Sequence, residues 1–174
     1  METPEKVKIL IIDDEEEIRL FLKKNLERQE YSVATAADGE EGLEKVRQSD
    51  IEIVFCDIMM PNLNGIDFLK KVRHYHLATQ VIMITGKADL ETCIEAIEYG
   101  ACGYLIKPIQ TKDVTDLILV AERNIFEEKE MLRKAIEGLK PGEAEDVFRR
   151  LSKTGNDVDK KINVIKKTLK KPQK

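Results

Sequence analysis

Five short apolar runs alternate with segments of helical apolar spacing along the first 106 residues of this 174-residue chain. The runs are residues 7–12, 32–36, 51–56, 80–85 and 103–106. Alternation of this kind predicts βαβ units, and right-handed crossovers turn such units into a parallel sheet with helices on both faces. The predicted fold class is therefore a doubly wound α/β fold with a five-stranded parallel sheet.

The composition is that of an ordinary globular protein, because 42% of the residues are apolar and can fill one core. No apolar run approaches the roughly 20 residues that a membrane span needs, and residues 1–8 lack the apolar region of a signal peptide. We therefore predict a cytoplasmic protein with no membrane segment. The cysteines form no CxxC pair, which argues against a disulfide framework or a zinc site; they are Cys56, Cys93 and Cys102.

Polar residues of particular types follow four of the five predicted strands. Asp13 and Asp14 follow the first strand, Asp57 the third, Thr85 the fourth and Lys107 the fifth. The carboxyl ends of parallel strands share one edge of the sheet, where open α/β folds bind ligands. Carboxylates gathered there repel one another and need a cation, and an all-oxygen set with room for water suits Mg²⁺.

This predicted cluster has the components of phosphoryl chemistry. A carboxylate such as Asp57 can act as a nucleophile towards a phosphoryl group. The ammonium of Lys107 suits one phosphoryl oxygen, and the hydroxyl of Thr85 can donate a hydrogen bond to another. The alternative interpretation of Asp57 alone is a residue that ends a strand and caps the following turn. The other polar strand ends favour the reactive role.

Four motifs in order resemble one known family, the response-regulator receiver domain of two-component signalling. They are IIDDEE (11–16), FCDIMMPNLNGID (55–67), MITGK (83–87) and YLIKP (104–108), and the resemblance covers about residues 6–125. It implies a flavodoxin-like sheet of strand order 2-1-3-4-5. It also implies that Asp57 accepts a phosphoryl group from a histidine kinase or a histidine phosphotransfer protein, with Mg²⁺ as cofactor. The metal ligands it implies are the side chains of Asp14 and Asp57, the backbone carbonyl of Met59, and Asp13 through water.

The same resemblance implies a conformational switch. Thr85 and Tyr104 match the positions of the family's switch hydroxyl and switch aromatic residue, and Lys107-Pro108 matches its cis peptide bond. A phosphoryl group adds about −1.5 to −2 charge units beside the hydroxyl, which can then turn towards it. The protein is accordingly expected to be a phosphoacceptor that takes part in its own phosphorylation and dephosphorylation, and not a turnover enzyme.

Two rival functions use the same residues differently. A phosphatase resembling the haloacid dehalogenases would have a second Asp two residues after its nucleophile, where this chain has Met59. A receiver-like domain without chemistry would lack some of the cluster residues, and all of them are present. Both rivals are therefore less favoured than the phosphorylated switch.

The last helical pattern continues beyond the predicted receiver domain (residues 1–125) through residues 126–140. Apolar residues recur every seven positions along this whole helical pattern, from residue 118 to residue 139, which predicts either pairing with a second copy or packing on the chain's own tail. The residues of this seam are Ile118, Ile125, Leu132 and Leu139.

Residues 141–174 form a predicted short basic helical extension. From Gly138 onward, 11 Lys and Arg face 5 Asp and Glu, a balance of +6; since the whole chain carries −4, the first 137 residues carry −10. Two amphipathic helices separated by a glycine-containing turn leave two interpretations open: docking on a partner, or DNA binding by a transcription regulator. The kinase, the signal and the output are not specified by the sequence.

Overall fold

The computed structural model describes residues 7–75, 78–87 and 89–137, with the backbone alone for 131–137. Its strands are β1 (Lys8–Ile12), β2 (Ser32–Ala36), β3 (Ile53–Asp57), β4 (Gln80–Thr85) and β5 (Gly103–Ile106). Its helices are α1 (Glu16–Arg28), α2 (Gly39–Gln48), α3 (Gly65–Tyr75), α4 (Leu90–Glu98) and α5 (Thr111–Glu137). Strands and helices alternate as the sequence predicts.

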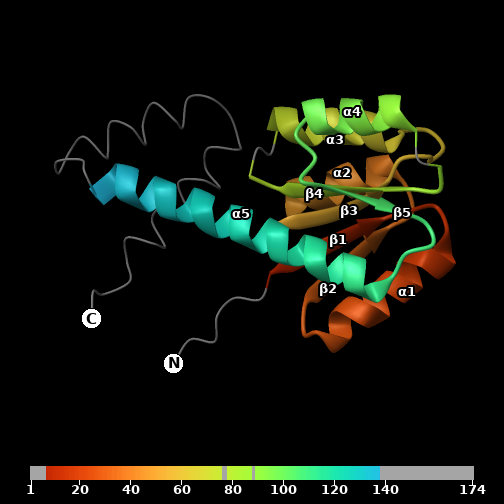
Figure 1. The fold of residues 1–174 in the computed structure, drawn as a ribbon, viewed down its shortest axis with the longest axis horizontal. Coiled ribbons are helices and arrows are strands. Elements are labelled where there is room, and N and C mark those ends of the chain that lie inside the picture. Colours follow the sequence, from red (N-terminus) through yellow and green to blue (C-terminus); the bar gives the residue numbers. More distant parts are fainter. Residues whose placement is uncertain (1–6, 76–77, 88, 138–174) are drawn as a thin grey trace. The chain divides into compact units, whose positions relative to one another are not determined.

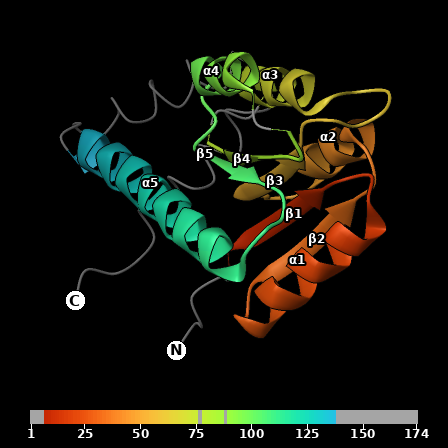
Figure 2. The ribbon, with the colours of Figure 1, turned by 45° about the vertical axis from the view of Figure 1, so that its right-hand side comes forward.

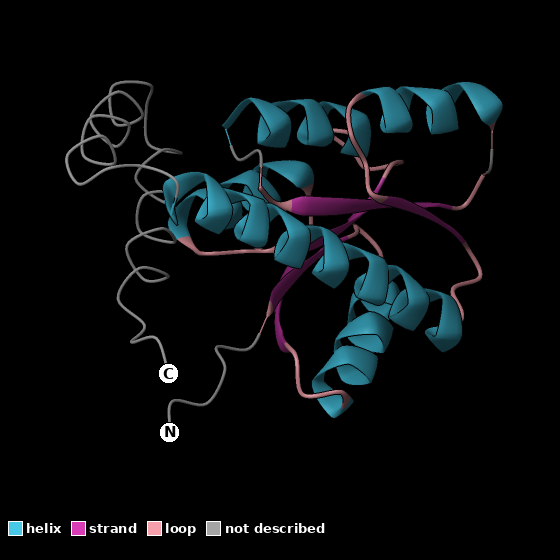
Figure 3. Cartoon of the chain, turned by 60° about the vertical axis from the view of Figure 1, so that its left-hand side comes forward, coloured by secondary structure: helices cyan, strands magenta, loops and turns pink. Residues whose placement is uncertain are grey.

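The five strands form one parallel sheet in the order β2-β1-β3-β4-β5. Helices α2, α3 and α4 lie on one face, and α1 and the first turns of α5 lie on the other (Figures 1 and 2). Both the predicted fold class and the predicted strand order are confirmed. The central strands β1, β3 and β4 lie between the two helical layers (Figure 3).

The core explains why these runs are almost wholly apolar. Leu10 and Ile12 belong to a buried cluster with residues of α2 and α3, while the alternate residues Ile9 and Ile11 are equally buried. Successive strand side chains point to opposite faces, so a strand between two helical layers is apolar at every position. A polar residue is therefore accommodated only at the end of such a strand, where the strand leaves the two helical layers.

The chain divides into two compact units, Met1–Arg123 and Asn124–Lys174, and α5 begins in the first and ends in the second. The sheet belongs entirely to the first unit. The predicted basic extension at residues 141–174 and Leu139 lie outside the described residues, as does the side chain of Leu132. Among the helices that the structure describes, none combines the length and apolar character of a membrane span.

Two residues of the predicted seven-residue seam, Ile118 and Ile125, are buried. Ile118 is only 1% exposed and belongs to the buried core, as do Val114 and Ala121 on the same face of α5. Its neighbour Leu119 is the exposed apolar residue, at 57%. Ile118 therefore packs within the receiver fold, and pairing with a second copy through this helix stays a prediction.

Candidate functional site

The carboxyl edge of the sheet brings the predicted site residues together. Asp13 directly follows β1, Asp57 is the last residue of β3, and Thr85 is the last residue of β4. Backbone hydrogen bonds hold these ends side by side: the amide of Ile58 donates to the carbonyl of Ile84 (2.8 Å), and that of Lys107 donates to the carbonyl of Thr85 (2.8 Å). The side chains are thus placed by the sheet itself.

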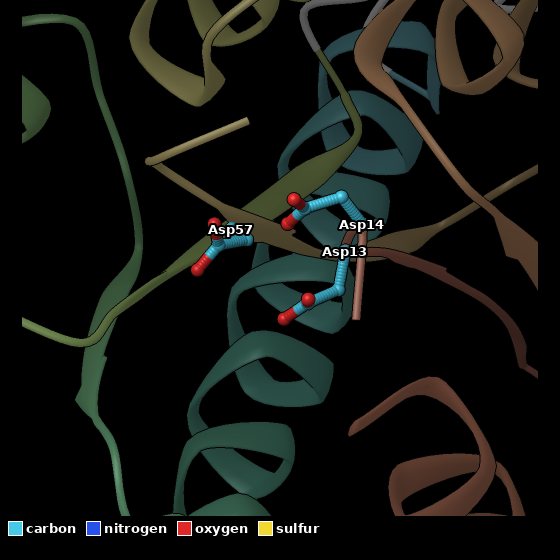
Figure 4. Close-up of side chains that lie close together, drawn as sticks. All are labelled: Asp13, Asp14 and Asp57. Carbon is cyan, nitrogen blue, oxygen red and sulfur yellow. The ribbon is translucent and has the colours of Figure 1, made fainter. Parts of the chain in front are cut away.

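Three carboxylates form the centre of the site. Asp13, Asp14 and Asp57 each offer an oxygen atom, and these atoms all lie within 4.8 Å of one another. Figure 4 shows their side chains converging. Asp13 and Asp57 are buried, at 0% and 2% exposure, and Asp14 is exposed. The cluster therefore has a buried floor and one acid facing solvent.

The ammonium of Lys107 lies between the two buried acids. Its Nζ is 3.1 Å from Asp13 Oδ2 and 3.1 Å from Asp57 Oδ1, and it donates a hydrogen bond of 2.7 Å to Glu15 Oε1. The lysine follows β5, and its peptide bond to Pro108 is cis. Its side chain is 16% exposed, so the positive charge is held largely out of water beside the acids.

Burial dominates the electrostatics of the two inner acids. It raises the pKa of Asp57, the Asp13 carboxylate raises it further, and Lys107 opposes the rise. Burial also raises the pKa of Asp13, against a hydrogen bond from the Glu15 amide and the charge of Lys107. Burial alone would lower the pKa of Lys107, but the hydrogen bond to Glu15 and the ion pair with Asp13 outweigh burial and raise this pKa. Lys107 therefore stays charged at neutral pH and favours the ionised acids.

The start of α1 orients the first acid. The amide of Glu15 donates to Asp13 Oδ1 (2.8 Å), while Arg19 Nη1 donates to the backbone carbonyls of Asp13 (2.6 Å) and Asp14 (3.0 Å). These two residues hold the Asp13-Asp14 turn in place. Neither was predicted from the sequence to act at the site, because contacts with backbone atoms leave no signal in the residue pattern.

A close backbone approach fixes the third strand end. The amide of Gly65, the first residue of α3, donates to the carbonyl of Ile58 (3.0 Å). A Cβ on this glycine would lie 2.3 Å from the carbonyl oxygen of Asp57 and 2.8 Å from the Cα of Ile58. Only a residue without a side chain lets the loop close over the end of β3. Met59, between them, is 73% exposed.

The two predicted switch residues lie on neighbouring strands. The hydroxyl of Thr85 donates to the carbonyl of Lys87 (2.8 Å) and accepts from its amide (3.1 Å), so it is engaged by its own loop. The hydroxyl of Tyr104 is buried without a hydrogen bond from the described residues, although Thr85 is near enough to influence its pKa. Burial raises the pKa of Tyr104.

The donor set suits a hard divalent cation. Asp13 Oδ2 and Asp57 Oδ1 are buried and accept no hydrogen bond within the described part of the chain, although each forms an ion pair with Lys107. Three carboxylates within reach of one another, one of them open to water, match the oxygen ligands and the retained waters of Mg²⁺. The acidic pocket could therefore hold Mg²⁺.

The fold has solved counterparts among receiver domains. A CheY-like receiver domain from Methanospirillum hungatei is 32% identical with a TM-score of 0.67, covering 72% of this chain and 99% of that one. The chemotaxis protein CheY4 of Vibrio cholerae is 31% identical with a TM-score of 0.64, covering 66% and 98%.

The family model of the response regulator receiver domain matches residues 9–119, and the chain belongs to this family. Among curated relatives, the alkaline phosphatase synthesis transcriptional regulatory protein PhoP of Bacillus subtilis is 39% identical over 107 residues, which are 62% of this chain and 45% of PhoP. The response regulator ArlR of Staphylococcus saprophyticus is 34% identical over 107 residues, covering 62% and 48%. The chain thus matches less than half the length of these relatives.

Proposed function

We propose that Asp57 accepts a phosphoryl group from the phosphohistidine of a histidine kinase or a histidine phosphotransfer protein. The supporting observation is a buried carboxylate with the Lys107 ammonium 3.1 Å away and two further acids within 4.8 Å. An oxygen of Asp57 attacks phosphorus as the bond from phosphorus to the imidazole nitrogen breaks, and the imidazole regains a proton from solvent. The product is an aspartyl phosphate on Asp57.

The surrounding residues serve positioning and charge. Asp13, Asp14 and Asp57, with the carbonyl of Met59, would hold Mg²⁺, and the bound ion would neutralise the negative charge that gathers between acids and phosphoryl oxygens. Lys107 favours the ionised form of Asp57, because its charge opposes the rise that burial causes in the pKa of that acid. Its ammonium then pairs with a phosphoryl oxygen. Asp57 is the residue that is covalently modified in this step, and the protein itself is the phosphoacceptor.

The conformational consequence starts at Thr85. The phosphoryl oxygens compete with the Lys87 carbonyl for the Thr85 hydroxyl, and a charge-assisted hydrogen bond is stronger than the neutral one it replaces. Thr85 turns inward, and Tyr104, whose buried hydroxyl has no hydrogen bond among the described residues, follows into the space. The surface formed by α4, β5 and the first turns of α5 then changes for a partner in the cytoplasm. To change the ratio of active to inactive conformation from 1:99 to 99:1, phosphorylation must favour the active conformation by about 5.5 kcal/mol.

Treatment with a small phosphodonor and Mg²⁺ tests the proposal. Wild type should gain one acid-labile phosphoryl group by intact-protein mass spectrometry, and Asp57→Asn should gain none. The control variant Asp67→Asn removes a carboxylate of α3 that is outside the cluster and should label like wild type. Absence of labelling in wild type would contradict the proposal.

A second candidate output is transcription regulation through the basic residues 141–174. It is supported by the charge balance of +6 from Gly138 onward, and the relative PhoP is named a transcriptional regulatory protein. Gel shifts at increasing salt test it, because phosphate contacts give an affinity that falls steeply with salt concentration. If the protein does not bind DNA even at low salt, transcription regulation through direct DNA binding is excluded for this chain.

A further inference from the structure

Glu15 occupies the N-cap position of α1 but does not cap it. The backbone there is extended, with φ −79° and ψ 109°, and the side chain makes no capping hydrogen bond. An N-cap side chain ordinarily accepts a hydrogen bond from an amide in the first turn. The carboxylate of Glu15 instead accepts from Lys107 Nζ at 2.7 Å, across 92 positions of sequence. The acid is therefore directed at the site and not at its own helix.

This contact is the shortest that Lys107 makes with the three acids. Glu15 lies at 2.7 Å, and the buried oxygens of Asp13 and Asp57 lie at 3.1 Å each. An ammonium carries three N–H donors, and here it faces three carboxylate oxygens. A phosphoryl oxygen that arrives at Lys107 must therefore take the place of one of them.

Solvent exposure decides which partner is displaced. The side chain of Glu15 is 60% exposed, whereas those of Asp13 and Asp57 are 0% and 3% exposed. A carboxylate released into water is solvated at once, while a buried carboxylate that loses its cation stays unpaired in a poorly polar environment. Glu15 is the partner that Lys107 can release at the lowest cost.

We propose that Glu15 is a positioning residue that holds Lys107 in the unmodified protein and competes with a phosphoryl group for its ammonium. The inference rests on the proposed function of Asp57 and deepens it, since it names a residue that sets the affinity of the site for phosphoryl oxygens. Removing the charge of Glu15 frees one donor of Lys107 and strengthens the binding of a phosphoryl group or its mimic.

Beryllofluoride, a mimic of the aspartyl phosphoryl group, tests this inference by fluorine NMR titration at saturating Mg²⁺. Glu15→Gln should bind it about two- to fivefold more tightly than wild type at low salt, as expected for loss of an exposed competing ion pair. The gain should shrink as salt screens the charges. Glu16→Gln, the matched control, removes the same charge from the neighbouring exposed residue in the first turn of α1 and should bind like wild type.

Affinity for beryllofluoride in Glu15→Gln that equals or falls below that of wild type would overturn the role of Glu15. An equal gain in Glu16→Gln, or a gain that is independent of salt, would overturn it as well. Failure of wild type itself to bind beryllofluoride with Mg²⁺ would instead overturn the proposed function, and this inference with it. The two failures are thus distinguished by the behaviour of the wild-type protein.

Discussion

Replacing Gly65 by Ala tests whether close backbone packing fixes the end of β3. The added Cβ would lie 2.3 Å from the carbonyl oxygen of Asp57 and 2.8 Å from the Cα of Ile58, whereas ordinary contacts begin at 3.4 Å. Both atoms belong to the backbone, so no side chain can rotate out of the way. Either the loop or the strand end must move by about 1 Å.

The structure allows the size of the effect to be estimated. Overpacking a tight site costs about 1–3 kcal/mol, and the gain in helix propensity from Gly to Ala offsets at most about 1 kcal/mol. Because the clash is with backbone, the upper part of the range applies, and we expect a net loss of about 2 kcal/mol of unfolding free energy. Urea unfolding followed by far-UV circular dichroism measures it.

Gly86, directly after Thr85, provides the matched control. A Cβ there would meet its nearest atom, the Lys107 Cδ, at 3.9 Å, which is ordinary contact. Gly86→Ala should change the unfolding free energy by less than about 0.5 kcal/mol. A Gly65→Ala protein as stable as Gly86→Ala would refute the reasoning, because it would mean that the loop over Asp57 can relax freely.

Three further predictions concern the site. Mg²⁺ at ten times its Kd should raise the unfolding free energy of wild type by about 1.4 kcal/mol, and a thermal shift that is as large in Asp57→Asn would contradict the site. Burial raises the pKa of Asp13 and Asp57 in the folded protein above the pKa in the unfolded chain. The two acids therefore stabilise the folded protein most when they are protonated, at a pH below their unfolded pKa, and this contribution is lost as the pH rises through their folded pKa. Without metal, Asp57→Asn should therefore be more stable than wild type at pH 7, with a difference that shrinks in acid, and urea midpoints without that trend would count against it. Met59→Asn should lose its phosphoryl group faster than wild type, because an amide can hold the hydrolytic water that the exposed thioether cannot; equal decay rates would discard this idea.

The fold was predictable because its signals are local and periodic. Runs such as residues 51–56 are apolar at nearly every position, as a strand between two helical layers requires. Once the strands are parallel, their polar ends share one edge, so the meeting of Asp13, Asp57 and Lys107 followed from order alone. The strand order came from the resemblance to receiver domains, since periodicity does not specify which strands are neighbours.

The parts that could not be predicted from the sequence depend on how far side chains reach. Glu15 directly precedes the two acids of the first turn of α1, and nothing in the residue pattern distinguishes it from them, yet its carboxylate accepts a hydrogen bond from Lys107. Arg19 binds backbone carbonyls, which have no residue type to signal them. Ile118 fits a seven-residue seam and a buried core face equally well, because both require an apolar residue at that position.

Direct identification of the modified residue tests the central claim most sharply. The protein is incubated with a small phosphodonor and Mg²⁺, the acyl phosphate is trapped by borohydride reduction, and the peptide that contains it is sequenced by mass spectrometry. We predict modification at Asp57, its loss when the metal is chelated, and no modification in Asp57→Asn. Modification at another residue, or equal labelling of Asp57→Asn, would contradict the account.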